Sequence, residues 1–358
     1  MQIKKKLFIQ LIFILVLIEA VLHFTTPFLR LDQNTSVWYA QWVFPEFDKK
    51  NSGVGLYYAH PYSSYAMKPN IDGRTNNLGF RGSIVSFDKP KGVYRIVCVG
   101  GSTIYGARNQ DKYTIPKLLE GYLVKVSKKK IEVINAGLLS GTTMETFNIL
   151  CFRVIPLKPD LIIIYQGFND LVPRIANNFQ NDYSHFRKIP LRPFYSINKY
   201  LNNLYIVRYL KLILNKDENL HDYTFNYENI PDNEAEKTSN FYKSGPEAFK
   251  NHMEMMIKLL QAYNIPVVVP TFAYQEGLND YWVKVFPEKL WGVGITQNNS
   301  SIQELTVKYN LANVDLYKFC LGKKEFFSGK IHFNNRGSAE VSRFLGERII
   351  EAFPEIIK

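Results

Sequence analysis

A serine hydroxyl, a small-residue loop, an amide side chain and an imidazole each follow a different apolar run of this chain. Ser102 comes after two glycines at the end of the run at 94–99, where the chain can turn sharply and present a hydroxyl. A helix that begins there directs backbone amides toward developing negative charge. Taken alone, Ser102 fits a nucleophile, a phosphate-binding turn or a helix cap.

Three further groups complete the set that acyl transfer requires. The loop at 135–143 is rich in small residues, so its amides can approach a ligand closely. Asn169 follows the run at 161–165, and its side-chain amide can donate a hydrogen bond to an oxyanion. His332 stands just before the last expected helix. A hydroxyl, oxyanion donors and an imidazole after successive strands predict acyl-transfer chemistry.

The sequence from residue 94 onward predicts the elements that position these groups. Short apolar runs alternate with helical patterns, which indicates a parallel sheet covered by helices on both faces. In such a sheet, ligands bind at the carboxyl ends of the strands. The expected strands are 94–99, 131–134, 161–165, 266–269 and 312–314, and the expected helices are 114–127, 246–263 and 337–352.

The same residues resemble a known superfamily. Four segments look like the four blocks of the SGNH, or GDSL, hydrolases, in the right order: Gly-Gly-Ser-Thr at 100–103, Asn-Ala-Gly at 135–137, Gly-Phe-Asn-Asp at 167–170 and His-Phe-Asn-x-x-Gly at 332–337. The likeness covers about residues 93–358 except for an insertion. It implies a three-layer α/β/α, flavodoxin-like fold with about five parallel strands. It also implies an ester-bond hydrolase, and no cofactor or metal ligand cluster is expected.

The resemblance implies roles for individual residues. Ser102 would be the nucleophile and His332 the base that activates it. The backbone N–H of Ser102, the side chain of Asn169 and one backbone N–H of the second block would form the oxyanion hole. The family usually has a glycine five positions after the asparagine of that block. This chain has Ser140 there, followed by Gly141, and either can supply the donor.

The chain departs from the family at the acid that orients the histidine. An aspartate usually stands three residues before it, and this chain has Gly329. Glu325 is the nearest upstream carboxylate and Asp315 ends the fifth expected strand, so each is a possible acid. Otherwise the alternatives are a Ser-His dyad, a histidine oriented by a carbonyl, or an impaired enzyme.

The first 30 residues predict a signal anchor. Three lysines at 4–6 precede an apolar run at 7–24, which is near the roughly 20 residues that span a bilayer. No small-x-small cleavage motif closes the run, so we expect an uncleaved transmembrane helix. The basic flank then leaves the N-terminus in the cytoplasm and the later residues outside.

Two further segments lie outside the alternating pattern. Residues 31–90 predict a loop-rich leader, and its segments at 60–62, 68–70 and 77–82 are similar to the leader of membrane-anchored bacterial SGNH proteins. Arg81 is either part of a structural strap or a group that grips an anionic substrate. Within the expected domain at 91–358, residues 172–245 predict an insertion over the sheet edge. This insertion is either a substrate lid or a structural elaboration.

Composition narrows the classes of function. The chain has 358 residues, 46% of them hydrophobic, which suffices for a large core. Its net charge is +12, but the 44 Lys and Arg residues are scattered, which argues against a nucleic-acid partner. The three cysteines are too few and scattered for a disulfide framework or a zinc site. Cys98, inside an expected strand, is interpreted as a small buried hydrophobe.

We therefore expect a serine esterase whose catalytic domain is anchored on the outer side of a membrane. Its expected substrates are acyl esters, O-acetyl esters above all, of a cell-envelope polysaccharide, with a lipid substrate as the alternative. An O-acyltransferase with the same Ser102 chemistry is a second hypothesis, because the two reactions differ only in whether water is excluded. A catalytically weak glycan-binding or assembly protein of the same fold is the third.

Overall fold

The chain divides into two units. The computed structural model describes residues 2–25, 57–60, 63–71, 74–187, 204–214, 225–279 and 285–357. Unit 1 comprises Met1–Tyr58 and Lys188–Phe225, and unit 2 comprises Ala59–Arg187 and Asn226–Lys358. The division falls inside the expected leader and the expected insertion. Parts of both, at 26–56, 61–62, 72–73, 188–203 and 215–224, lie outside the described residues.

Unit 2 is built on a parallel sheet that, within the described residues, has four strands in the order β4-β3-β5-β6. The strands are β3 (Val93–Gly100), β4 (Lys130–Gly137), β5 (Leu161–Tyr165) and β6 (Val267–Val268). The first of them in the chain lies between the second and the third, which is the flavodoxin-like order. The predicted parallel α/β fold is confirmed. The fifth expected strand is reduced to a parallel bridge between Ala312 and Val268.

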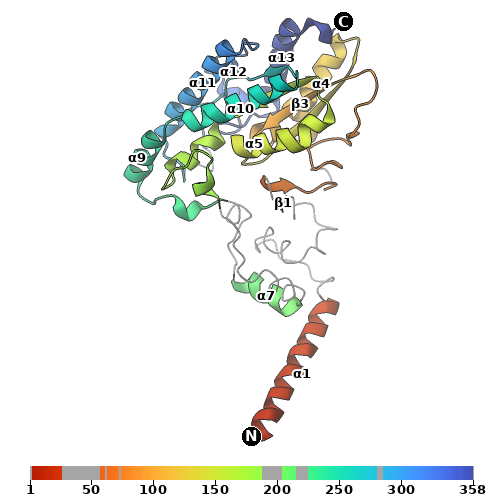
Figure 1. Cartoon of the computed structure of the whole chain (residues 1–358), viewed down its shortest axis with the longest axis vertical. Coiled ribbons are helices and arrows are strands. Elements are labelled where there is room, and N and C mark those ends of the chain that lie inside the picture. Colours follow the sequence, from red (N-terminus) through yellow and green to blue (C-terminus); the bar gives the residue numbers. More distant parts are fainter. Residues whose placement is uncertain are drawn as a thin grey trace. The chain divides into compact units, whose positions relative to one another are not determined.

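Helices cover both faces of this sheet (Figure 1). From β3 the chain crosses to β4 on one side, and from β4 it crosses back over β3 to β5 on the other side. Because these crossovers run in opposite directions across the sheet and are both right-handed, the intervening helices lie on opposite faces. Helix α4 (Ile115–Val126) packs against α13 (Asn335–Ala352). Helix α10 (Glu247–Ala262) packs against α5 (Thr143–Ile149) and α11 (Leu290–Lys308). The three helices expected from the sequence are α4, α10 and α13.

Helix α11 was missed in the sequence because it lacks a clear polar and apolar side. Its buried residues include Asn298, Asn299 and Ser301 as well as aliphatic ones. It also contains Gly294, where a Cβ would lie 2.7 Å from Leu171 Cδ1, so a side chain there would displace Leu171. Helices α5 and α9 (Glu234–Ser244) were likewise not predicted from the sequence.

The leader is fastened to the start of β3 by a buried arginine. Arg95 has no exposed surface. Its guanidinium pairs with Glu132 at 2.6 Å and donates to the carbonyl oxygen of Ser86 at 3.0 Å and of Leu157 at 2.7 Å. Further upstream, β1 (Tyr57–His60) pairs with β2 (Ser64–Met67). Cys98 lies fully buried in β3, as expected, and burial raises the pKa of its thiol.

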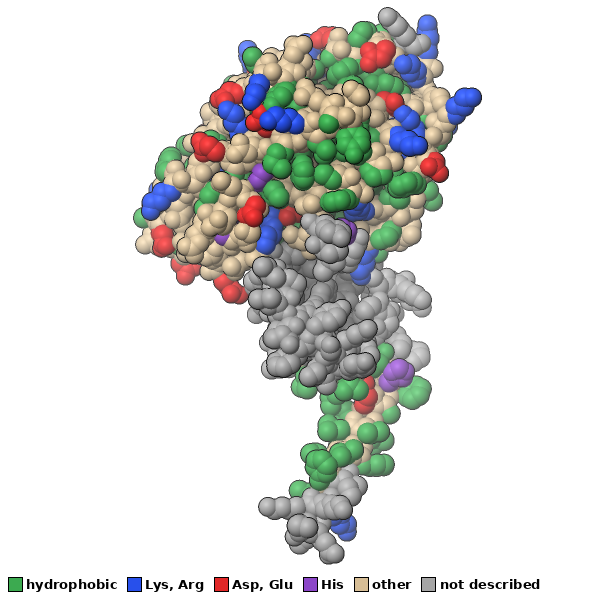
Figure 2. All heavy atoms as spheres, in the orientation of Figure 1, with side chains coloured by type: hydrophobic (Ala, Val, Ile, Leu, Met, Phe, Trp, Pro, Cys, Tyr) green, Lys and Arg blue, Asp and Glu red, His purple; other side chains and the backbone are tan. Residues whose placement is uncertain are grey.

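Unit 1 contains α1 (Gln2–Thr25) and α7 (Tyr205–Leu214). Among the described helices, the stretch Lys6–Thr25 of α1 is long and apolar enough to cross a membrane, with a mean hydropathy of 2.5. A signal sequence has the same length and composition. Hydrophobic side chains cover this helix in Figure 2. The Glu19 carboxylate, inside the apolar run, accepts hydrogen bonds from the backbone N–H of Tyr205 at 2.6 Å and Ile206 at 2.9 Å.

Candidate active site

Ser102 and His332 are in direct contact. The distance from His332 Nε2 to Ser102 Oγ is 2.9 Å. Ser102 is the first residue of the short helix α3 (Ser102–Tyr105) directly after β3, and His332 precedes α13. The separation suits a base that removes the hydroxyl proton. The structure thus brings together the expected nucleophile and base from opposite ends of unit 2.

The two glycines before Ser102 are required by close packing. Gly100 has a φ of 155°, and a Cβ there would lie 2.2 Å from the carbonyl oxygen of Tyr165. A Cβ on Gly101 would lie 2.6 Å from Asn169 Nδ2. The contact at Gly100 is with backbone and leaves no room for a side chain, whereas a side chain at Gly101 would displace the Asn169 amide. The close approach therefore places the Asn169 amide directly against the residue that precedes the serine.

The Asn169 side chain has a hydrogen to spare for an oxyanion. Asn169 lies in the 3₁₀ turn η6 (Phe168–Leu171), just after β5. Its Nδ2 donates to the carbonyl oxygen of Gly141 at 2.8 Å, which orients the amide. A primary amide carries two hydrogens, so one remains beside Gly101. Such a neutral donor can stabilise charge on a substrate oxygen bound at Ser102.

The second-block loop favours Ser140 over Gly141 as the backbone donor. The N–H of Gly141 donates to the carbonyl oxygen of Leu138 at 3.1 Å, so it is already engaged. Ser140 has a φ of 58°, in the left-handed region. A left-handed residue with a Cβ costs about 1–2 kcal/mol, which gives a physical reason for a glycine at this position in the family.

The loop that carries His332 is fixed by its neighbours. The backbone N–H of Ser328 donates to the carbonyl oxygen of His332 at 2.8 Å. Asn334 caps α13 by accepting from the N–H of Gly337, and it donates to the carbonyl oxygen of Glu325 at 2.8 Å. The carbonyl oxygen of Ile331 accepts a hydrogen bond at 3.2 Å from the hydroxyl of Thr103, the residue after Ser102. These contacts hold the imidazole against Ser102.

The two candidate acids occupy different surroundings. Asp315 Oδ1 accepts from Thr271 Oγ1 at 2.8 Å and from the N–H of Lys318 at 3.1 Å, so this carboxylate caps helix α12 (Leu316–Cys320). Glu325 is exposed to solvent in the loop before His332. The identity of an acid that orients His332, like the roles of the other site residues, stays a prediction.

Arg81 fits the structural interpretation. Its side chain is 8% exposed, and its guanidinium donates to the carbonyl oxygens of Tyr105 at 3.0 Å, Gly106 at 2.8 Å and Asn109 at 2.7 Å. These carbonyls follow Ser102 in the chain. The donors therefore fix the backbone that follows Ser102, which favours a structural strap over a grip on an anionic substrate.

A buried polar cluster beside the site was not predicted from the sequence. Asp170 has no exposed surface and accepts hydrogen bonds from the N–H of Thr143 at 3.0 Å and from its hydroxyl. The same hydroxyl lies 2.8 Å from His252 Nδ1. Desolvation raises the pKa of Asp170 to about 7. The aspartate of the Gly-Phe-Asn-Asp block was a visible signal, whereas nothing in the sequence marks His252.

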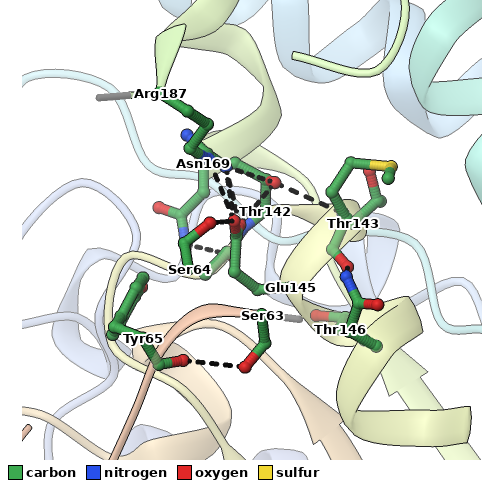
Figure 3. A network of polar contacts seen from close by, with 12 residues as sticks. Ser63, Ser64, Tyr65, Thr142, Thr143, Glu145, Thr146, Asn169 and Arg187 are labelled. Carbon is green, nitrogen blue, oxygen red and sulfur yellow. Dashed lines mark hydrogen bonds and ion pairs between the residues drawn. The ribbon is translucent and has the colours of Figure 1, made fainter. Parts of the chain in front are cut away.

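A second cluster surrounds the start of α5 (Figure 3). Glu145 is 2% exposed, and its carboxylate accepts from the N–H of Thr142 at 2.9 Å in a capping box. Arg187 forms a salt bridge with Glu145 at 2.7 Å. This pair has no signal in the sequence, because its members are far apart in the chain and lie outside the four blocks.

Comparisons with known proteins find similarity among solved structures only. No family model and no curated protein matches the sequence. A lipase/acylhydrolase from Enterococcus faecalis is 18% identical over 71% of this chain and 94% of its own, with a TM-score of 0.44. A lipolytic protein of the G-D-S-L family from Veillonella parvula is 10% identical over 73% of this chain and 98% of its own, with a TM-score of 0.41. A catalytic mutant of an acetylxylan esterase from Geobacillus stearothermophilus is 12% identical over 72% of this chain and 93% of its own, with a TM-score of 0.42.

The description of the Veillonella parvula protein names the G-D-S-L family, which is one name of the superfamily that the four sequence blocks resemble. The identities of the three neighbours are 18% or less and their TM-scores 0.44 or less, so these neighbours do not indicate what this chain does.

Replacement of Arg81 tests its role as a strap. Arg81→Ala removes a charged donor from three carbonyl oxygens, of which those of Tyr105 and Gly106 keep a second donor. We expect the free energy of unfolding, measured in urea, to fall by about 3–5 kcal/mol. The ratio of kcat/KM for an anionic ester to that for a neutral ester should stay unchanged. A selective loss for the anionic ester would instead indicate substrate binding.

Replacement of Asp170 tests its raised pKa. Because the pKa is about 7 in the folded chain and 3.8 in the reference state, the folded chain holds a proton that the unfolded chain releases between these values. The contribution of this group to stability is therefore present below about pH 4 and is lost as the pH rises through about 7. Asp170→Asn should become progressively more stable relative to the parent across this range in urea unfolding. A constant difference would contradict the assignment.

Proposed function

We propose that this protein is a serine esterase of the SGNH type. The observation that carries the proposal is the 2.9 Å separation of His332 Nε2 and Ser102 Oγ at the carboxyl end of the sheet. The Asn169 amide lies against Gly101, the residue before this serine, and can supply the second requirement of acyl transfer, a donor for the oxyanion. A base, a hydroxyl and a neutral donor at this edge fit ester cleavage better than phosphate binding, which would call for cationic or several backbone donors.

The geometry supports a two-step reaction. Ser102 Oγ attacks the ester carbonyl carbon while its proton passes to His332 Nε2, and the carbonyl oxygen becomes an oxyanion. The backbone N–H groups of Ser102 and Ser140 and the Asn169 amide donate to this oxygen. The C–O bond to the alcohol then breaks, and the alcohol leaves with the proton from His332. Water repeats the sequence on the acyl-enzyme, releasing the acid and restoring Ser102.

The substrate we propose is an O-acetyl ester of an envelope glycan outside the membrane. The location is supported by the apolar helix α1 with its basic N-terminal flank. A second feature favours retention of this helix, because Glu19 caps the N-terminus of α7 and is therefore part of the folded unit 1. The preference for acetyl esters rests on the family resemblance.

The nucleophile is tested with the full chain in detergent micelles. The parent should hydrolyse p-nitrophenyl acetate and react covalently with a fluorophosphonate probe. Ser102→Ala should lose at least about 10³-fold in kcat and all labelling, since the attacking oxygen is gone. Ser127→Ala, which alters a serine that bonds to the carbonyl oxygen of Ile356, is the matched control and should retain both.

A folded parent that neither turns over nor reacts with the probe would overturn the esterase proposal and favour a binding protein. With an acetylated glycan as donor, release of free acetate supports hydrolysis. Appearance of the acetyl group on an added glycan acceptor would instead identify an acyltransferase.

A further inference from the structure

A tyrosine of the leader contacts the peptide group to which we assign an oxyanion donor. Tyr65 lies in β2, is 2% exposed, and its hydroxyl donates to the carbonyl oxygen of Leu139 at 2.5 Å. The carbonyl of Leu139 and the N–H of Ser140 belong to the same planar peptide group. In a trans peptide these two bonds point in opposite directions. A bond that fixes the carbonyl therefore also fixes the direction of the N–H.

The turn that contains this peptide has two possible conformations, in which the N–H of Ser140 points in opposite directions. Residues 138–141 form a β-turn closed by the hydrogen bond from the N–H of Gly141 to the carbonyl oxygen of Leu138. Ser140, the third residue of the turn, has a φ of 58°, and Leu139 is not among the residues with positive φ. These values correspond to a type II turn. A type I turn differs mainly by rotation of the central peptide, here the group that joins Leu139 and Ser140, through about 180°.

Ser140 by itself favours the type I turn. A type II turn requires positive φ at its third position, which glycine adopts freely and serine adopts at a cost. A type I turn places that residue at negative φ, where serine is unstrained. An interaction outside the turn must therefore stabilise the observed orientation, and the Tyr65 hydroxyl is placed to do so.

The backbone on the far side of this peptide is held independently. The carbonyl oxygen of Gly141 accepts from Asn169 at 2.8 Å and from Gln166 Nε2 at 3.1 Å. The N–H of Thr142 donates to Glu145, which Arg187 pairs with (Figure 3). With these contacts in place, the peptide between Leu139 and Ser140 is the part of the loop whose orientation depends on Tyr65.

We propose that Tyr65 is a positioning residue for the oxyanion hole. Its hydroxyl holds the central peptide of the turn so that the N–H of Ser140 faces the oxyanion on the acyl group at Ser102. This inference rests on the proposed esterase function. It adds to the site a residue from the leader, outside the four blocks that the sequence resembles. The leader then has a role in the chemistry as well as in connecting the anchor to the sheet.

Tyr65→Phe removes the hydroxyl and keeps the buried ring. Loss of a complete oxyanion donor costs about 10²–10³-fold in kcat, and misorientation of one donor should cost less. We expect kcat for p-nitrophenyl acetate to fall about 10- to 100-fold with KM nearly unchanged, because the donor acts mainly in the transition state. The rate of fluorophosphonate labelling should fall in parallel.

Ser140→Gly separates positioning from general stability. Glycine adopts the required φ without cost, so the turn needs the Tyr65 bond less. The fold-change in kcat caused by Tyr65→Phe should therefore be smaller in the Ser140→Gly background than in the parent. An equal fold-change in both backgrounds would overturn the positioning role, even if Tyr65→Phe alone unfolds at a lower temperature.

The matched control is another buried hydroxyl of the leader. Thr75 is 7% exposed, and its hydroxyl donates to the carbonyl oxygen of Lys68 at 2.6 Å, away from the turn. Thr75→Val should lower the unfolding temperature and leave kcat unchanged. If the parent shows Ser102-dependent turnover and Tyr65→Phe keeps the parental kcat, only the inference about Tyr65 fails. If Ser102-dependent turnover is absent, the esterase proposal fails and the inference falls with it.

Discussion

The ends of three parallel strands are aligned at one level, and the arrangement of the site depends on this register. Gly100 of β3 pairs with Gly137 of β4 on one side and with Tyr165 of β5 on the other. The first residues after these three strands therefore emerge together. The approach at Gly100 is close enough to exclude a side chain, so the turn that presents Ser102 lies directly against β5. Ser102, the loop after β4 and Asn169 are neighbours because the three strands end at the same level.

Hydrogen bonds between the loops convert this proximity into a defined geometry. The N–H of Leu138 donates to the carbonyl oxygen of Gly100 at 2.8 Å, and Asn169 donates to that of Gly141, so each loop is tied to its neighbour. The loop that bears His332 arrives from the far end of the chain and is tied to α3 through Thr103. An oxyanion hole stabilises charge without reorganisation only when its donors are fixed beforehand. These bonds fix the groups to which we assign that role.

Segments outside the four sequence blocks take part in the same structure. Arg81 of the leader bonds to the carbonyls that follow Ser102, and Tyr65 bonds to the turn before α5. Arg187, at the last residue of unit 2 before the chain passes into unit 1, pairs with Glu145 at the start of α5. The leader and the beginning of the insertion therefore both contact the second-block loop.

The sequence by itself determined the α/β class, most strand positions, three helices and the pair Ser102 and His332, because these depend on local apolar patterns and ordered short motifs. It did not determine the fifth strand, which forms only a bridge, or α11, whose buried polar residues and glycines hide its period. Only the tertiary structure favoured Ser140 over Gly141 as the backbone donor. Only it showed that Arg81 bonds to the carbonyls that follow Ser102, and that Thr143 connects Asp170 with His252. These features depend on contacts between residues far apart in the chain and on whether a given N–H is already bonded. A single sequence carries no pattern for either.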